Sequence, residues 1–431
     1  MTEPLTFVDL GPADREPDDD ERAWLDRHVL PIRPSEFVIG LSGARALADD
    51  DDVHPLIIRD QHGTYRAGRF VGELNVAGRA LRIEPRLGFP VLAEWMAEAV
   101  NVPVIPNAAG LEGGTAVIPQ LLAMIWTALI ADASRHARPA FRGEQRAVAA
   151  QLRGRLDVRA TATLRARGIA DRAVSIDRPK RMDHDLSRVL VCADVALDRA
   201  LRLITPTWRP AQVGDLMRDL RGAVGAHPQL PSLRELDRVR YTPITVGYRR
   251  AARLSHAIAR GQGRISTAKE SAVSGALVDV AEVWELFLVA CAKRAFGAGS
   301  VEHAARTSQR RHLLSSPTTG RRLGRIRPDI VVSDDRLRTC LVLDAKYKRL
   351  AANPYRPDGV DRSDLYQLTS YMATAPSGAA GALLYPPSAD AVSVAEADGP
   401  WTTESGARLT FRRLSATRER VVEELGELWS R

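Results

Sequence analysis

Three residues in the last third of the chain have types and spacing that suit metal-dependent cleavage of a phosphodiester. Asp329 begins one short apolar run, and Asp344 and Lys346 stand two positions apart at the end of the next. Because residues two apart on a strand point to the same face, we expect Asp344 and Lys346 to project together and Asp329 to meet them from the neighbouring strand. Two carboxylates and the carbonyl of Ala345 would bind a hard divalent cation, with the ammonium beside the attacking water.

The lysine is notable because lysine is rare in this chain. Only five of the 61 basic residues are lysine, and the others are arginine. A position that needs only positive charge is therefore usually filled by arginine. Lys346 indicates a need for a compact ammonium with a titratable proton, which a guanidinium does not supply.

Two flanking helices supply candidate helpers. An apolar stripe predicts a helix over 277–296 with Glu285 at its border, where a carboxylate can reach the metal directly or through water. A second predicted helix, over 362–375, places Asp364, Gln367 and Tyr371 on one face. We therefore assign Glu285 as an assisting metal ligand and Gln367 as a residue that orients the water or a phosphate.

A basic segment precedes the first of the two strands. Seven arginines and no acidic residue lie between Glu302 and Asp329. Six of them are candidate DNA-backbone ligands, because arginine binds phosphate in a bidentate manner: Arg310, Arg311, Arg321, Arg322, Arg325 and Arg327. A disordered basic loop with no specific role is the alternative.

Each motif alone has a plain structural explanation. A Pro-Asp dipeptide often starts a strand, and alternating charges on an edge strand keep it soluble. Glu285 and Gln367 would be ordinary in a solvated helix face. The order of all these residues in one segment favours the catalytic interpretation.

The whole chain reads as a soluble protein of the reducing cytoplasm. Its 431 residues predict two or three domains, and its three cysteines show no paired spacing. The acidic start is unlike a signal peptide, and the most apolar segment, 277–296, carries three acidic residues, so no membrane span is expected. Residues 1–60 carry a balance of −9 within a net charge of +8. The basic remainder suggests a nucleic-acid partner, although an arginine-rich proteome would give the same balance.

The pattern along the chain predicts a mixed α/β, multidomain protein. Residues 1–30 are expected to be an acidic flexible lead-in, and 31–140 a β-rich N-terminal domain with a hairpin that turns at 77–79. Residues 141–265 are expected to form a mostly helical middle, connecting region. Residues 266–431 have an α-β-β-β-α-β order, counting one strand of the basic segment, which predicts a mixed sheet flanked by helices.

Pro328-Asp329 and Asp344-Ala-Lys346 resemble the two halves of the PD-(D/E)xK restriction-endonuclease-like motif. With Asp279-Val-Ala-Glu-Val-Trp-Glu285 and Asp364-Leu-Tyr-Gln-Leu-Thr-Ser-Tyr371, they resemble McrC, the nuclease subunit of McrBC-type, modification-dependent (5-methylcytosine) restriction systems. Upstream, 71–85 and 154–157 resemble that family's amino-terminal segments.

The resemblance implies a Mg²⁺-dependent DNA endonuclease, with Mn²⁺ as an alternative metal, that acts in anti-phage defence. It also implies a partner, a McrB-like AAA+ GTPase ring that reads the DNA and receives the amino-terminal half of this chain. The sequence agrees, since no lysine follows a glycine and a phosphate-binding loop is absent. Two other functions remain open: a non-catalytic subunit that grips DNA and stimulates the partner NTPase, and a stand-alone RecB-like repair nuclease.

Overall fold

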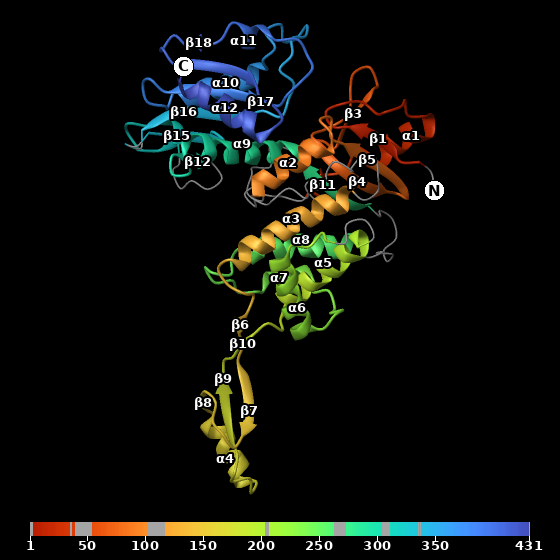
Figure 1. The fold of residues 1–431 in the computed structure, drawn as a ribbon, viewed down its shortest axis with the longest axis vertical. Coiled ribbons are helices and arrows are strands. Elements are labelled where there is room, and N and C mark those ends of the chain that lie inside the picture. The colour runs from red at the N-terminus through yellow and green to blue at the C-terminus, as the bar shows by residue number, and fades with distance from the viewer. Residues whose placement is uncertain are drawn as a thin grey trace. The chain divides into compact units, whose positions relative to one another are not determined.

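The computed structural model describes residues 3–34, 37–38, 54–100, 117–202, 207–262, 273–303, 311–334, 336 and 338–430. The chain divides into two compact units, Met1–Leu121 with Thr267–Arg431, and Leu122–Ser266. This division differs from the four predicted segments, because most of the N-terminal domain and the C-terminal domain share the first unit. The predicted mixed α/β class is confirmed (Figure 1).

A four-stranded sheet forms the amino-terminal part of the first unit. Its order is β1 (Leu5–Val8), β5 (Arg79–Glu84), β4 (Phe70–Val76) and β11 (Val273–Asp279), and β2 (Ile57–Arg59) pairs with β3 (Tyr65–Ala67) as a separate ribbon. The predicted hairpin is confirmed, since β4 and β5 pair in antiparallel register. Ala77 and Gly78 form its turn with φ of 50° and 82°, the left-handed values of a two-residue type I′ turn.

The acidic lead-in is structured, contrary to the expectation of a flexible segment. Its first residues form β1, which pairs in parallel with β5, and Asp19–Trp24 form α1, followed by the single π-helical turn η1 (Leu25–Val29). Asp18 caps α1, and Glu21 completes a reciprocal capping box. The acidic run is therefore favourable where it stands, because carboxylates stabilise a helix amino terminus. Trp24 is buried in the core beneath the sheet.

A six-stranded mixed sheet forms the carboxyl-terminal part of the first unit. Its order is β12 (Val301–His303), β15 (Ile330–Ser333), β16 (Thr339–Ala345), β17 (Ala380–Tyr385), β19 (Arg408–Arg413) and β18 (Trp401–Thr402). β16 pairs antiparallel with β15 and parallel with β17. The predicted α-β-β-β-α-β order holds with one correction. The first strand is β12, whereas the basic segment forms a separate ribbon of β13 (Arg311–Ser315) and β14 (Arg322–Ile326).

Helices cover this sheet on both faces (Figure 1). α9 (Val280–Phe296) and α10 (Arg362–Met372) both pack against β16. Gly381 favours the close approach of α10 to β17, because a Cβ there would lie 2.8 Å from the sulfur of Met372 and that side chain would have to move. α2 (Phe89–Val100) and α12 (Arg418–Ser430) pack on α9, and the short α11 (Val394–Ala397) packs on β19.

The helix predicted over 277–296 begins three residues later in the structure, at Val280. Residues 277–279 complete β11, and Asp279 is the N-cap of α9, accepting hydrogen bonds from the amides of Ala281 and Glu282. The apolar run is continuous across this boundary, so hydrophobic spacing alone did not reveal the change from strand to helix.

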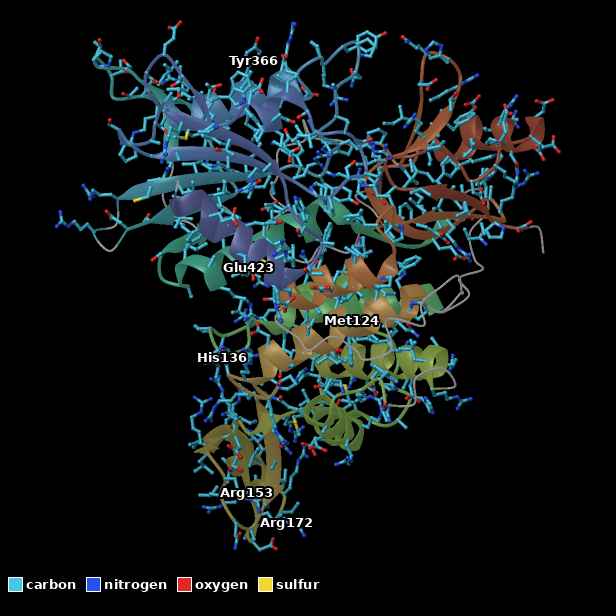
Figure 2. The ribbon with its side chains drawn as sticks, turned by 45° about the horizontal axis from the view of Figure 1, so that its top comes forward. Met124, His136, Arg153, Arg172, Tyr366 and Glu423 are labelled. Atoms are coloured by element: carbon cyan, nitrogen blue, oxygen red, sulfur yellow. The ribbon has the colours of Figure 1, made fainter. Side chains whose placement is uncertain are left out.

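The second unit is a group of helices with a projecting arm. Its helices are the greater part of α3 (Val117–Ser134), α5 (Asp185–Leu201), α6 (Ala211–Val224), α7 (Leu233–Asp237) and α8 (Tyr248–Gln262). The arm consists of β6 (Phe141–Arg142), β7 (Gln145–Ala149), β8 (Arg155–Leu156), α4 (Val158–Ala166), β9 (Ala173–Asp177) and β10 (Lys180–Arg181). Figure 2 shows Arg153 and Arg172 at its far end.

Within the described residues, no helix combines the length and the hydropathy that crossing a bilayer would require.

Candidate active site

Asp344 lies near the carboxyl end of β16 and Lys346 directly follows the last residue of that strand, and their side chains project together, as predicted. Nζ of Lys346 lies 2.5 Å from Oδ2 of Asp344. The carboxylate is buried, whereas the lysine side chain keeps 13% of its exposure. The amide of Lys346 donates to the carbonyl of Leu384 at 2.9 Å, which extends the pairing with β17 and fixes the backbone under both side chains.

Asp329 stands one residue before β15 and meets the same strand end. Antiparallel register places Ile330 opposite Leu343, so Asp329 arrives beside the Asp344-Ala345 peptide. Its Oδ2 accepts a 2.7 Å hydrogen bond from the amide of Ala345. The structure therefore brings the three residues singled out from the sequence into one cluster.

Gln367 reaches this cluster from α10 and starts a chain of hydrogen bonds. Nζ of Lys346 donates to Oε1 of Gln367 at 2.6 Å, and Nε2 of Gln367 donates to the hydroxyl of Tyr371 at 2.6 Å. Tyr371 in turn donates to the carbonyl of Arg327 at 3.2 Å. The amide of Gln367 is thus fixed at both ends and holds the ammonium in place.

A second lysine–carboxylate pair, to which the sequence assigned no role, borders the cluster. Nζ of Lys348 lies 2.9 and 3.0 Å from the two carboxylate oxygens of buried Asp364, and Lys346 lies 3.9 Å from the same residue. Two signals were available: Asp364 shares its helical face with Gln367, and Lys348 is another of the few lysines.

Glu285 has its direct contact with a histidine beside the cluster. Its Oε1 lies 2.7 Å from Nε2 of buried His303 on β12. Its charge still reaches the cluster, because it is among the causes that raise the pKa values of Asp329 and Asp344. Glu285 is therefore an electrostatic neighbour in this structure, with His303 as its direct partner.

Burial and like charge dominate the electrostatics of the cluster. Burial, followed by the charges of Asp344 and Glu285, raises the pKa of Asp329 well above its ordinary value. Burial also raises the pKa of Asp344, although Lys346 opposes this. Burial is the largest single effect on Lys346 and would lower its pKa, but the contact with Asp344 and the charges of Asp344, Asp329 and Asp364 together outweigh it and raise that pKa. The site therefore favours a bound cation, which would offset the repulsion between the carboxylates.

The donor set fits a hard divalent cation held by few protein ligands. Oδ2 of Asp344 is buried and receives no well-aligned hydrogen bond, its contact with Lys346 being an ion pair. No group of three or more His, Cys, Asp or Glu side chains with metal-binding geometry occurs among the described residues. Mg²⁺ is commonly held by one or two carboxylates, with water and substrate phosphate completing its shell, and Asp329 and Asp344 would supply two such carboxylates.

The arginines predicted to bind DNA lie mainly on the β13–β14 ribbon. Arg321, Arg322, Arg325 and Arg327 are exposed. Arg311 instead donates to the hydroxyl of Thr339 at 3.1 Å, and Arg310 lies outside the described residues. A disordered loop is therefore the wrong description of residues 311–326, which form a paired hairpin.

Both the sequence and the fold of this chain are similar to those of known proteins. Residues 66–386 match the family described as "McrBC 5-methylcytosine restriction system component". A solved chain from the half-complex of a tetradecameric assembly of Thermococcus gammatolerans McrB AAA+ hexamers with bound McrC has a similar fold. Its TM-score is 0.54 at 16% identity, over 99% of this chain and 100% of that chain. A chain of the cryo-EM Thermococcus gammatolerans McrBC complex gives a TM-score of 0.40 at 15% identity, over 68% and 88% of the two chains. No curated protein matched the sequence.

Proposed function

The chain belongs to the McrBC 5-methylcytosine restriction system component family, and from that membership we propose that it is a McrC-like, Mg²⁺-dependent DNA endonuclease subunit. Family membership agrees with the resemblance found in the sequence. The observation that carries the proposal is the cluster of Asp329, Asp344 and Lys346 at the ends of two paired strands. Its position, between α9 and α10 on a mixed sheet, supports a PD-(D/E)xK core.

Each residue of the cluster has a separate proposed role in phosphodiester hydrolysis. Asp329, Asp344 and the carbonyl of Ala345 would hold the Mg²⁺ or Mn²⁺ ion. When bound, such an ion polarises the phosphate and favours hydroxide near neutral pH. Lys346, kept as an ammonium by its carboxylate neighbours, stabilises the extra negative charge of the transition state or of the attacking hydroxide. Gln367 fixes Lys346, and Glu285 adds negative charge that strengthens cation binding.

The exposed arginines of β14 and Arg327 are proposed to hold the DNA backbone. They lie within eight residues of Asp329 along the chain, so a phosphate bound by them is close to the cluster. These contacts position the duplex without reading its sequence.

An AAA+ NTPase is the proposed partner. The similar fold in a complex titled with McrB AAA+ hexamers and bound McrC supports this, as does the missing phosphate-binding loop of the present chain. We propose that the partner is a GTPase that supplies translocation and selects modified DNA. The amino-terminal half of this chain would be its docking region.

The test is plasmid cleavage with Mg²⁺, with and without the partner NTPase. We expect the wild type to cut with the partner, and Asp344→Ala and Lys346→Ala to lose cleavage. Asp334→Ala, which removes a partly buried carboxylate in the β15–β16 turn that pairs with Arg338, should cut normally. If both cluster variants cut as well as the wild type, the catalytic assignment is wrong.

The same assay separates the two alternatives. A chain that never cuts but stimulates the partner's NTP hydrolysis is a non-catalytic subunit. Cleavage by the chain alone, without NTP, would instead indicate a stand-alone repair nuclease.

A further inference from the structure

The β13–β14 ribbon exposes leucines among its arginines. Leu314 and Leu323 are directly paired across the two strands, and their exposed fractions are 64% and 60%. Because directly opposed residues share a face of a ribbon, the two side chains form one apolar surface. Single exposed leucines are ordinary on a protein surface, whereas two that are paired across strands form a contiguous apolar patch.

The ribbon has a defined conformation that holds this pair in place. Its loop is closed by hydrogen bonds between Ser316 and Arg321 and between Gly320 and Ser316, of 2.8 and 2.9 Å. Gly324 adopts a φ of +66°, and a Cβ there would lie 3.2 Å from Leu313. At the other end, Ile326 is buried in the core beside the six-stranded sheet. The leucines therefore project from a ribbon that is anchored at its base.

Charge identifies the kind of molecule that this surface fits. Residues 303–328 contain no acidic side chain. Among the described residues, no carboxylate forms an ion pair with Arg321, Arg322 or Arg325, whereas several exposed arginines elsewhere in the chain do have such a partner. An apolar pair flanked by unneutralised arginines is complementary to a polyanion. A second copy of the same ribbon would bring like charges together.

From these observations we propose that the β13–β14 ribbon enters the minor groove of duplex DNA, with Leu314 and Leu323 wedged against the bases and the arginines on the flanking phosphates. This inference rests on the proposed nuclease function and specifies how that site holds its substrate. Apolar wedges beside arginines are a known means of opening and bending a duplex at the minor groove.

The leucine pair lies close in sequence to the candidate metal ligand Asp329. Leu323 lies six residues before Asp329, so the two are separated by at most roughly 20 Å of extended chain. That span corresponds to about six base pairs. The wedge would therefore distort DNA within one helical turn of the bond to be cut, and would bring its backbone toward Asp329 and Asp344.

The experiment measures binding to a duplex of about 30 base pairs, with 2-aminopurine as a reporter of unstacking. The full chain carries Asp344→Asn so that it cannot cut. We expect the double variant Leu314→Ser with Leu323→Ser to bind the duplex about tenfold or more weakly. The increase in 2-aminopurine fluorescence on binding should be abolished, and the salt dependence of the DNA affinity should not change. Arg322→Gln with Arg325→Gln should instead reduce the slope of log affinity against log salt by about two.

A control and three outcomes decide the proposal. Leu152→Ser, at an equally exposed leucine of the arm, should bind as the parent does. Wild-type affinity and an unchanged reporter signal in the leucine double variant would overturn the wedge. So would a change in oligomeric state on removing the leucines, with DNA binding intact, since the surface would then be a protein contact. If DNA binding depends on the two leucines but the wild-type chain, with Asp344 intact, does not cleave DNA, the wedge would be supported and the proposed nuclease refuted.

Discussion

The hydroxyl of Tyr347 donates a 2.7 Å hydrogen bond to Oδ2 of Asp9, which joins the residue after the candidate catalytic lysine to the amino-terminal sheet. Both groups are buried. The guanidinium of Arg86 lies over the Tyr347 ring at 4.7 Å and contacts the same carboxylate. The four-stranded and six-stranded sheets therefore share a polar contact inside one compact unit, just past the end of β16, which carries Asp344.

Tyr347→Phe should destabilise the protein through Asp9. The substitution removes the donor while the carboxylate stays buried, and an unsatisfied buried acceptor costs about 1–3 kcal/mol of unfolding free energy. Urea denaturation should show this loss. Tyr355→Phe, at an exposed tyrosine, serves as the control and should be neutral. Equal stabilities of the two variants would show that the Asp9 contact contributes nothing.

Asp9→Asn should change how stability depends on pH. Burial raises the pKa of Asp9 above its ordinary value near 4, against the opposing effect of Arg86 and Tyr347. The folded protein then binds this proton more tightly than the unfolded chain. Asp9 therefore lowers stability as pH rises from about 4 through its folded pKa. Unfolding free energies of the wild type and Asp9→Asn, measured from pH 4 to 8, should diverge in this direction. Parallel curves would contradict the assignment.

The sequence predicted the cluster because its geometry is local. Asp344 and Lys346 follow from the two-residue period of a strand, and Asp329 follows from the pairing of consecutive strands. Asp9 could not be found in this way. The parallel pairing of β1 with β5 brings Asp9 to Tyr347, and nothing in the sequence near Asp9 predicts that pairing. The acidic residues around Asp9 instead resemble a solvated tail.

The buried carboxylate of the second unit gives a stability prediction with a clear asymmetry. Asp194 is fully buried, and it pairs with Arg209 at 2.7 Å and with Arg221. The arginines are partly exposed, so they can be hydrated when the carboxylate is lost. Arg209→Ala should therefore cost about 3 kcal/mol, because it leaves a buried charge with one partner fewer, and Asp194→Asn should cost less. Thermal unfolding of both variants checks the order. A larger loss of stability in Asp194→Asn than in Arg209→Ala would contradict this account of the Asp194 ion pairs.

Tyr371→Phe should reduce catalysis without reducing DNA affinity. The hydroxyl fixes Gln367 and is itself fixed by the carbonyl of Arg327, so its loss frees the amide that holds Lys346. Removal of such supporting contacts commonly costs about 10- to 100-fold in activity. We expect kcat to fall by this factor with KM for DNA unchanged. Tyr366→Phe, at the exposed tyrosine of the same helix (Figure 2), should leave both constants unchanged. A change confined to KM would refute the positioning role.

Asp329→Asn should stabilise the protein in EDTA and remove its response to Mg²⁺. Burial and the charges of Asp344 and Glu285 disfavour an ionised Asp329, so a neutral amide relieves repulsion while its oxygen can still accept from the Ala345 amide. Without this carboxylate, the cation loses one of its two acidic ligands. In thermal unfolding, Mg²⁺ at a hundred times its dissociation constant should stabilise the wild type by about 2.7 kcal/mol and the variant by far less. Asp334→Asn should behave as the wild type. An equal response to Mg²⁺ in wild type and Asp329→Asn would mean that the ion binds elsewhere, whatever the effect on cleavage.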